Sequence, residues 1–457
     1  RAGQGPRALW AHPCAAPPPD PDVPSRCSCG LISGLTWRQG GLAPVPPFAA
    51  PMRLVYTSSP LAAAAVDAPE GVRALRWKGP STVSEDARRL SEICPLVRPC
   101  LDRLEAYRPG KPIEEVRREL GLSEVYKLAS NENPLGPSRE AIETMQRVLA
   151  DAWLYPEDTC FDLVRELSAH LGVPAERLII GRGSDELIHL IGMAFVNPGE
   201  ELIMADPPFP MYPITATQMD GWAVRVPLKD YTHDLPAMAA AITPKTKVIF
   251  IANPHNPTGT IVRKPELEAF LSRVPDHALV VMDEAYCEFV DDPGYPTSLD
   301  YVAEGRNVVV LRTFSKIYAL AGLRVGYGVF PDHLAPAVKR VRPPFNVSTV
   351  AQAAAVASLR DAGQVARSKA YNIEARRYLC GEFDRLGLAY APSQANFILV
   401  DLGVDCVEAF QRLLRRGYIV RTGDVFDLPT HVRVSFGTPE QNAGFIAALE
   451  QVLAELR

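Results

Sequence analysis

Four residues able to bind an aldehyde and a phosphate together lie in one short stretch, TFSKIYALAGLRVGY: Thr313, Ser315, Lys316 and Arg324. A lysine amine can form a Schiff base with an aldehyde, whereas hydroxyl donors and a fixed positive charge suit a phosphate dianion. Pyridoxal 5'-phosphate carries both groups, so the stretch predicts a covalent site for this cofactor at Lys316. A serine–lysine pair by itself is more often a surface feature, so the prediction depends on motifs elsewhere in the chain.

The ring of this cofactor makes further demands, and the sequence offers a residue for each. A buried carboxylate keeps the ring nitrogen protonated, and Asp283 at the end of ALVVMDEAY fits, although such an acid is about as often a cap or metal ligand. Asn256 in NPHNPTG and Tyr286 in DEAY can donate to the ring oxygen. Phe209 in DPPFPMY could cover the ring face, and is otherwise a core aromatic.

A glycine loop offers a second phosphate contact. Gly181 and Gly183 precede a predicted helix that Ser184 would cap. Free N–H groups and the positive end of the dipole allow a helix N-terminus to bind phosphate. The alternative is an ordinary cap, because Asp185 and Glu186 place negative charge at the same point.

The elements that would position these residues alternate between strands and helices. The strand segments are short and apolar, and often β-branched: ELIMADP, AVRVPL, KVIFIANP, ALVVMDEAY and NVVVLRTF. Continuous apolar strands indicate burial on both faces, hence an α/β fold with a mainly parallel sheet. Function gathers at the strand ends of such sheets, which is where the polar residues above occur.

Changes in composition and hydrophobic pattern along the chain predict four regions. Residues 1–95 are a low-complexity extension, 96–137 an N-terminal arm, 138–345 a large cofactor-binding domain, and 346–457 a smaller α+β C-terminal domain. Helices are predicted from about residue 112, with Leu120 on its apolar side, and over about 138–151, 161–171, 264–273, 351–386 and 439–456.

The first 95 residues are rich in proline and alanine runs and show no hydrophobic period. Such a segment cannot bury enough apolar surface to offset its ordering entropy, which predicts disorder. It is either an organelle transit peptide or upstream sequence that does not belong to the working protein. If the segment is upstream sequence, the protein is predicted to be cytoplasmic. If it is a transit peptide, the protein is predicted to be in a plastid.

Composition excludes several classes of function. The 457 residues carry a net charge of −5 without a basic excess, which argues against nucleic acid as the main partner. No apolar run reaches the roughly 18 residues of a membrane span. The nine cysteines lack paired C-x-x-C spacing, which predicts reduced thiols and no metal site.

Taken together, NPHNPTG, DEAY and TFSK followed by Arg324 resemble the class II aminotransferases, which are pyridoxal-phosphate-dependent transferases of fold type I. Five further motifs narrow the resemblance to the histidinol-phosphate aminotransferases, over residues 98 to 457: NENPLGPS, LYPED, GRGSDE, SQANF and HVRVSFGTPEQN. His255 and Phe209 depart from the commonest residues of that family but keep the implied roles. Residues 1–95 have no counterpart in it.

The resemblance implies a role for each motif residue. Lys316 would hold the cofactor and then move the substrate proton, Asp283 would pair with the ring nitrogen, and Phe209 would stack on the ring. Asn256 and Tyr286 would bind the ring oxygen. The cofactor phosphate would be held by Gly183, Ser184, Asp185, Thr313, Ser315 and Arg324.

Substrate recognition and assembly follow from the same resemblance. Arg433 would bind the carboxylate of the amino-acid substrate, and Arg421 the phosphate of the other substrate, with Tyr107 and Asn396 nearby. An arginine fork suits both groups because it makes bidentate contacts. Tyr155 would reach into the site of a partner subunit, which implies a homodimer.

The function implied is amino transfer between L-glutamate and imidazole-acetol phosphate, which gives 2-oxoglutarate and L-histidinol phosphate. Alternatives on the same scaffold are an aromatic amino-acid aminotransferase and a threonine-phosphate decarboxylase. A cofactor-binding sensor without turnover is a further alternative, but it would need a missing catalytic residue or an added DNA-binding domain, and neither is evident.

Overall fold

The computed structural model describes residues 64–65, 75–76, 94, 96–104 and 110–457. The chain divides into two units, residues 1–58 and residues 59–457, and all described residues belong to the second. The predicted disorder of residues 1–95 therefore falls almost entirely outside the described residues. The predicted substrate contact Tyr107 lies outside them too.

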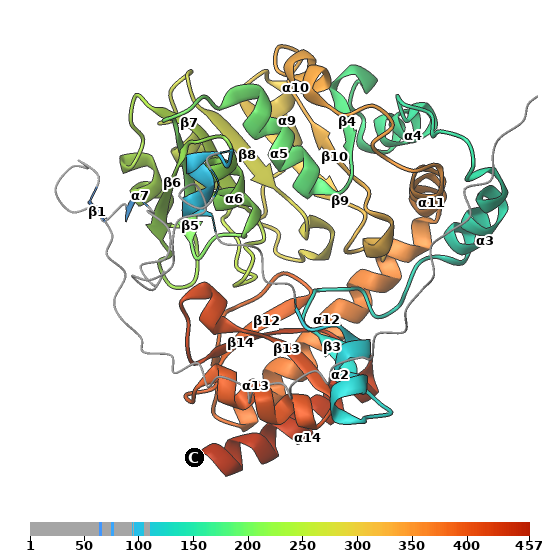
Figure 1. Ribbon diagram of the computed structural model, residues 1–457, viewed down its shortest axis with the longest axis vertical. Coiled ribbons are helices and arrows are strands. Elements are labelled where there is room, and N and C mark those ends of the chain that lie inside the picture. The colour runs from blue at the N-terminus through green and yellow to red at the C-terminus, as the bar shows by residue number, and fades with distance from the viewer. Residues whose placement is uncertain (1–63, 66–74, 77–93, 95, 105–109) are drawn as a thin grey trace, which may run out of the picture. The chain divides into compact units, whose positions relative to one another are not determined.

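The larger of the two sheets in the described part of the chain has nine strands in the order β1-β2-β6-β5-β7-β8-β9-β10-β4 (Figure 1). Its central strands from β6 to β9 are parallel, whereas β10 runs antiparallel to β9 and β4, and β2 antiparallel to β6. The strands are β1 Ala64–Ala65, β2 Leu75–Arg76, β4 Leu178–Gly181, β5 Glu201–Asp206, β6 Trp222–Pro227, β7 Thr246–Ala252, β8 Leu279–Asp283, β9 Val308–Thr313 and β10 Gly326–Val329. The mainly parallel α/β architecture is confirmed.

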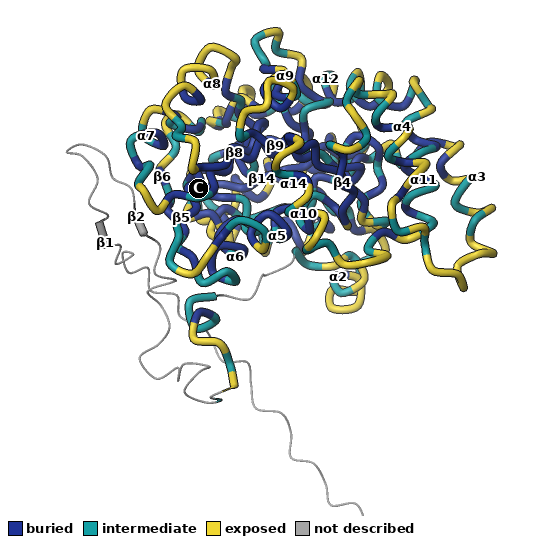
Figure 2. The backbone as a smooth tube through the Cα atoms, turned by 90° about the horizontal axis from the view of Figure 1, so that it is seen from above, coloured by how far each residue is buried: buried dark blue, intermediate teal, exposed yellow. Residues whose placement is uncertain are grey.

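Successive side chains of the central strands enter two separate cores. In β7, Ile249 and Ile251 belong to one core, whereas Val248 and Phe250 belong to the other. Because strand side chains alternate between faces, both faces of the sheet are covered, which explains the continuous apolar sequence. Figure 2 shows these strands buried beneath more exposed helices.

The helices divide between the two faces of the sheet. One core includes residues of α5 Ser184–Phe195, α6 Met211–Gln218 and α10 Ala335–Val341. The other includes residues of α3 Arg139–Val148, α4 Phe161–Leu171, α7 Leu235–Ala240, α8 Lys264–Leu271, α9 Ser298–Ala303 and α11 Thr349–Arg360. The 3-10 turns are η1 Pro99–Arg103, η2 Leu149–Asp151, η3 Ala175–Arg177, η4 Cys287–Phe289, η5 Ala321–Leu323 and η6 Gly423–Phe426.

A second sheet of five strands has the order β11-β12-β14-β13-β3. The strands are β3 Tyr126–Leu128, β11 Ala389–Tyr390, β12 Phe397–Asp401, β13 Tyr418–Thr422 and β14 His431–Ser435. The helices packed with this sheet are α2 Ile113–Leu120, α12 Ala362–Arg385, α13 Cys406–Arg415 and α14 Pro439–Leu456. The edge strand β3 pairs in parallel with β13, and the other pairs are antiparallel. The N-terminal arm is thus built into the C-terminal sheet.

The helical structure predicted over residues 351–386 is confirmed, and it is divided between two helices. Helix α11 ends at Arg360, and α12 spans Ala362–Arg385. Asp361 separates them, since its carboxylate accepts the backbone N–H of Gly363 and Gln364 at 3.0 and 3.2 Å and thereby caps α12. The buried alanines of α11 join the core of the large sheet, whereas α12 contacts both α11 and β12. The domain boundary predicted at residue 346 remains a proposal.

Two smaller expectations also differ from the structure. Leu120 is 39% exposed, and Val116 is the residue that buries the apolar side of α2. Ser184 is the first residue of α5 rather than its cap, because Gly183 holds that position. In both cases the helix itself lies where it was predicted, and the difference is one helical turn or less.

Candidate active site

A cavity of about 220 Å³ lies beside the carboxyl ends of β7, β8 and β9. Parallel strands bring their polar end residues to one edge of a sheet, which places Asn256, Asp283 and Lys316 in the same cavity. Its lining comprises Gly110, Ala129, Ser130, Asn131, Ser184, Asp185, Phe209, Pro210, Tyr212, Ala252, Pro254, Asn256, Asp283, Ala285, Tyr286, Thr313, Ser315, Lys316, Arg324, Arg421, Phe426 and Arg433. Most of the predicted site residues are therefore brought together.

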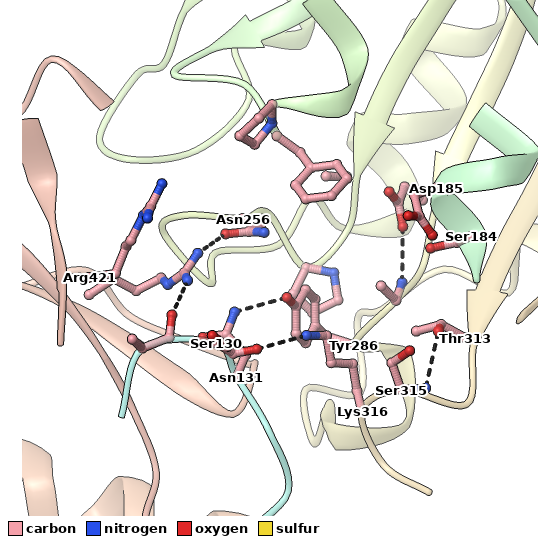
Figure 3. Close-up of a pocket in the computed structure, with 18 of the residues that line it drawn as sticks. Ser130, Asn131, Ser184, Asp185, Asn256, Tyr286, Thr313, Ser315, Lys316 and Arg421 are labelled. Atoms are coloured by element: carbon pink, nitrogen blue, oxygen red, sulfur yellow. Dashed lines mark hydrogen bonds between the residues drawn. The ribbon is translucent and has the colours of Figure 1, made fainter. Parts of the chain in front are cut away.

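Lys316 extends into this cavity from the turn after β9. Its Nζ donates to the backbone oxygen of Ser130 at 3.1 Å (Figure 3). The same Nζ lies 5.4 Å from the ring centroid of Tyr286, which holds the ammonium group over an aromatic face. The lysine amine is thus held at the cavity lining by its hydrogen bond to Ser130.

Asp283 ends β8 at the base of the cavity and is 6% exposed. Tyr212 donates its hydroxyl to Oδ2 at 2.8 Å, and the backbone N–H of Ala285 donates to Oδ1 at 3.2 Å. Burial outweighs these hydrogen bonds and raises the pKa of Asp283 to about 6. A protonated ring nitrogen beside it would supply the positive partner that this buried carboxylate lacks.

The opposite wall combines a helix N-terminus with an arginine. Arg324 donates to Ser315 Oγ at 3.2 Å through Nη1 and to Asp185 Oδ1 at 2.7 Å through Nη2. The first N–H groups of α5, from Ser184 on, have no acceptor inside the helix. Gly183 has φ 80°, and a Cβ there would lie 2.5 Å from Arg324 Nη2. The donors and the close backbone approach fit a phosphate group.

Two arginines of the second sheet line the other end of the cavity. Arg421 in β13 is the direct partner of Arg433 in β14, and residues opposite each other in a ladder point to the same face. Arg433 is buried and donates to Asn256 Oδ1 at 2.5 Å and to the Ala129 backbone oxygen at 2.7 Å. The cavity therefore has positive groups at both ends.

Three lining residues with polar side chains were not among the site residues predicted from the sequence. Tyr212 lies in α6, stacks on Phe250 with centroids 4.2 Å apart, and holds Asp283. Ser130 and Asn131 follow β3 and contact Lys316 and Tyr286. The one available signal was the hydroxyl of Tyr212, because a buried tyrosine needs a hydrogen-bond partner.

Other predicted residues lie beside the cavity or away from it. Phe209 lines it and packs edge-on against Tyr212, with centroids 5.5 Å apart. Asn396 is behind the wall, where its Nδ2 donates to the Asn131 backbone oxygen at 3.0 Å. Tyr155 is 82% exposed and stacks on Phe345 with centroids 4.9 Å apart, so it does not line the cavity of its own chain.

The residues present fit pyridoxal 5'-phosphate: an amine for its aldehyde, a buried carboxylate for its ring nitrogen, and hydroxyl, backbone and guanidinium donors for its phosphate.

Within the described residues, no group of three His, Cys, Asp or Glu side chains could hold a metal ion. No helix in the same part of the chain is both long and apolar enough to cross a bilayer.

Comparison with known proteins gives consistent matches. The profile of the family "Aminotransferase class I and II" matches residues 123–449. The histidinol-phosphate aminotransferase of Moorella thermoacetica is 51% identical over 361 residues, which cover 79% of this chain and 94% of that protein. That of Caldicellulosiruptor saccharolyticus is 46% identical over 358 residues, covering 78% and 100%. The crystal structure of histidinol-phosphate aminotransferase from Sinorhizobium meliloti in complex with pyridoxal-5'-phosphate has a TM-score of 0.73 and 29% identity, covering 79% and 98%.

Proposed function

This chain belongs to the class I and II aminotransferases, and we propose on that premise that it is a histidinol-phosphate aminotransferase of fold type I that uses pyridoxal 5'-phosphate. It moves an amino group between L-glutamate and imidazole-acetol phosphate, in histidine biosynthesis. The observation that supports the choice of substrates is the pairing of Arg421 with Arg433 at one end of the cavity. Two guanidinium groups suit one substrate with a carboxylate and one with a phosphate.

The cofactor, when bound, supplies an electron sink for the substrate carbon that loses its proton. Lys316 Nζ would hold the cofactor aldehyde in the resting enzyme and, once the substrate amine has displaced it, would be free to take the proton from the substrate Cα. Asp283 would keep a negative charge beside the ring nitrogen and so favour its protonation. Asn256 and Tyr286 would orient the ring through its oxygen, and Arg324 would hold the phosphate.

The half-reaction with different donors tests the proposal. L-histidinol phosphate, L-phenylalanine and L-threonine phosphate are each mixed with the cofactor-loaded protein, and the absorbance change is followed in a single turnover. Rapid conversion by histidinol phosphate alone is expected, because its phosphate and imidazole together would fill the substrate end of the cavity beside Arg421 and Arg433, whereas Arg324 serves the cofactor phosphate. Comparable conversion by phenylalanine would make the protein an aromatic aminotransferase. Release of carbon dioxide from threonine phosphate would make it a decarboxylase.

Substitution of Arg421 by glutamine adds a second arm to this test. We expect kcat/KM for histidinol phosphate to fall about 100-fold, since a charge-assisted contact of about 2 to 3 kcal/mol is lost. The glutamate half-reaction should change little, because Arg433 serves the carboxylate. Arg415→Gln is the control, since this arginine is exposed on α13 outside the cavity. An equal loss of kcat/KM for histidinol phosphate and glutamate would contradict the assignment of Arg421 to the phosphate and Arg433 to the carboxylate.

The protein is proposed to act as a homodimer. Supporting this, several large apolar side chains are exposed around α3 and α4: Leu149, Trp153, Leu154, Tyr155, Phe161 and Phe345. Contiguous exposed apolar surface indicates an interaction site. In the dimer, Tyr155 would extend to the cofactor phosphate region of the partner subunit.

Trp153→Glu is expected to convert the dimer to a monomer, because a charge would replace an apolar ring that is 80% exposed in the single chain. Light scattering after gel filtration measures the mass directly. Val407→Glu is the matched control, since this valine is an exposed apolar residue on α13. A wild-type monomer, or a dimer that persists in Trp153→Glu, would contradict the proposed interface.

The compartment is proposed to be the cytoplasm. Supporting it, the described cysteines are free thiols, as suits a reducing environment: Cys94, Cys100, Cys160, Cys287, Cys380 and Cys406. The proposed partners are small molecules and a second copy of the chain, with no role for nucleic acid or membrane. Cell fractionation tests the compartment, and recovery of the protein in plastids would favour the transit-peptide reading of residues 1–95.

A further inference from the structure

One buried amide connects the two sheets at the cavity wall. Asn131 follows β3, is 2% exposed, and has a left-handed backbone with φ 57°. Its Nδ2 donates to the hydroxyl of Tyr286 at 2.9 Å, and its backbone N–H donates to Ser435 Oγ at 2.8 Å. Figure 3 shows Asn131 beside Tyr286 and Lys316.

The hydroxyl of Ser435 decides which way the Asn131 amide faces. Ser435 Oγ lies 2.8 Å from Asn131 Oδ1, and a carbonyl oxygen can only accept, so the serine donates this bond. With the amide reversed, the serine proton would face an NH₂ group and lose its acceptor at a buried position. A buried donor without an acceptor costs about 1 to 3 kcal/mol, so the observed orientation is the favoured one.

The direction of this bond fixes where the proton of Tyr286 points. Because the phenol oxygen accepts from Asn131 Nδ2, the tyrosine does not donate to that amide. Tyr286 lines the cavity, so its own O–H is left for an acceptor inside it. A phenol aimed in this way stabilises negative charge on an oxygen in the cavity more than a phenol that donates to its neighbour would.

We propose that Asn131 and Ser435 are positioning residues that aim the hydroxyl proton of Tyr286 at the ring oxygen of the cofactor. The chain of donors runs from Ser435 O–H to Asn131 Oδ1, and from Asn131 Nδ2–H to Tyr286 Oη. This inference rests on the proposed function, since the acceptor belongs to pyridoxal 5'-phosphate. It goes further by assigning to Asn131 and Ser435 a role exerted through the Tyr286 hydroxyl.

Asn131→Asp tests the inference because the side chain keeps its shape and presents oxygen where Nδ2 stood. Tyr286 would then donate to the aspartate, and the cavity would lose its donor. The pH dependence of the absorbance of the lysine-bound cofactor is the readout, because the ring oxygen loses stabilisation of its anionic form. We expect the midpoint of this titration to rise by about one pH unit. Ser435→Ala should shift it in the same direction by less.

The control is the same substitution in a Tyr286→Phe background. If Asn131 acts through the tyrosine hydroxyl, Asn131→Asp shifts the midpoint by about one unit in the wild type and adds nothing in Tyr286→Phe. An equal shift in both backgrounds, or none in the wild type, would overturn the inference while leaving the proposed function intact. A wild-type protein that takes up no cofactor and shows no visible absorbance would overturn both.

Discussion

Lys316→Ala is expected to lower kcat by at least about 10⁴-fold. In the proposed mechanism the amine holds the cofactor and also moves the substrate proton, and a positioned acid–base group alone contributes a factor of about 10² to 10⁴ in rate. Lys316 lines the cavity, and its Nζ lies 3.1 Å from the Ser130 backbone oxygen. Steady-state and single-turnover rates measure the loss. Mass spectrometry after borohydride reduction should show the cofactor attached to the wild type and absent from the variant.

Two controls accompany this substitution. Lys264→Ala removes an exposed lysine of α8 and should leave both the rate and the attached mass unchanged. Added methylamine should restore part of the activity of Lys316→Ala, because a small amine can enter the space left by the side chain. A variant that still carries the cofactor after reduction would show that another lysine forms the link.

Asp283→Asn should lower kcat by about 10² to 10⁴. Removing one partner of a buried charge pair costs about 3 to 5 kcal/mol, and in the proposed mechanism the lost partner is the carboxylate that keeps the ring nitrogen protonated. Tyr212 holds the carboxylate at 2.8 Å, so the asparagine can occupy the same place with little rearrangement. A variant that retains more than a tenth of the wild-type kcat would contradict the role assigned to Asp283.

The same substitution should change the pH dependence of stability in the cofactor-free protein. The folded pKa of about 6 lies above the ordinary value of 3.8, so the folded state binds the proton more tightly than the unfolded state. Below about pH 4 the Asp283 carboxyl is protonated in both the folded and the unfolded state, so it does not lower the free energy of unfolding. As the pH rises through about 6 the buried carboxyl ionises, and the free energy of unfolding falls. The fall amounts to about 3 kcal/mol, from about 1.4 kcal/mol for each unit of pKa difference.

Urea denaturation of the cofactor-free proteins between pH 4 and 8 measures this effect. The difference in free energy of unfolding between Asp283→Asn and the wild type should grow in favour of the variant as the pH rises. A constant difference across this range would mean that Asp283 does not titrate there. The variant would thus be the more stable protein at neutral pH and much the poorer enzyme, as expected where function keeps a charge buried.

The sequence predicts the large sheet well, because its strands are buried on both faces and their apolar runs are unbroken. Once β8 and β9 are located, Asp283 and Lys316 follow, since they stand at the ends of those strands. Motif spacing then leads to Asn256 and Arg324. Local sequence carries this information because each residue lies within a few positions of its strand.

Asn131 and Tyr212 could not be predicted in this way, because their roles depend on distant partners. In the sequence, Asn131 is typical of a turn residue, and its partner Ser435 is separated from it by 304 residues. Tyr212 lies in a helix beside the more conspicuous Phe209. Such contacts are set by tertiary packing rather than by local propensity.

The break between α11 and α12 was missed for a different reason. Alanine-rich sequence on both sides of Asp361 favours helix throughout, and no proline interrupts it. Aspartate followed two residues later by Gly363 is a capping signal, but a weak one inside a long helical run. Side-chain capping by Asp361 decides the outcome locally.

The parallel pairing of β3 with β13 has a consequence for how the enzyme is made. Strand β3 and the following Ser130 and Asn131 leave the ribosome early, whereas β13 and β14 are among the last segments synthesised. Until then β3 has no neighbour in its sheet, and the cavity lacks one wall. The large sheet can form during translation, but the active site is completed only when the two ends of this region meet, so nascent chains cannot yet be working enzymes.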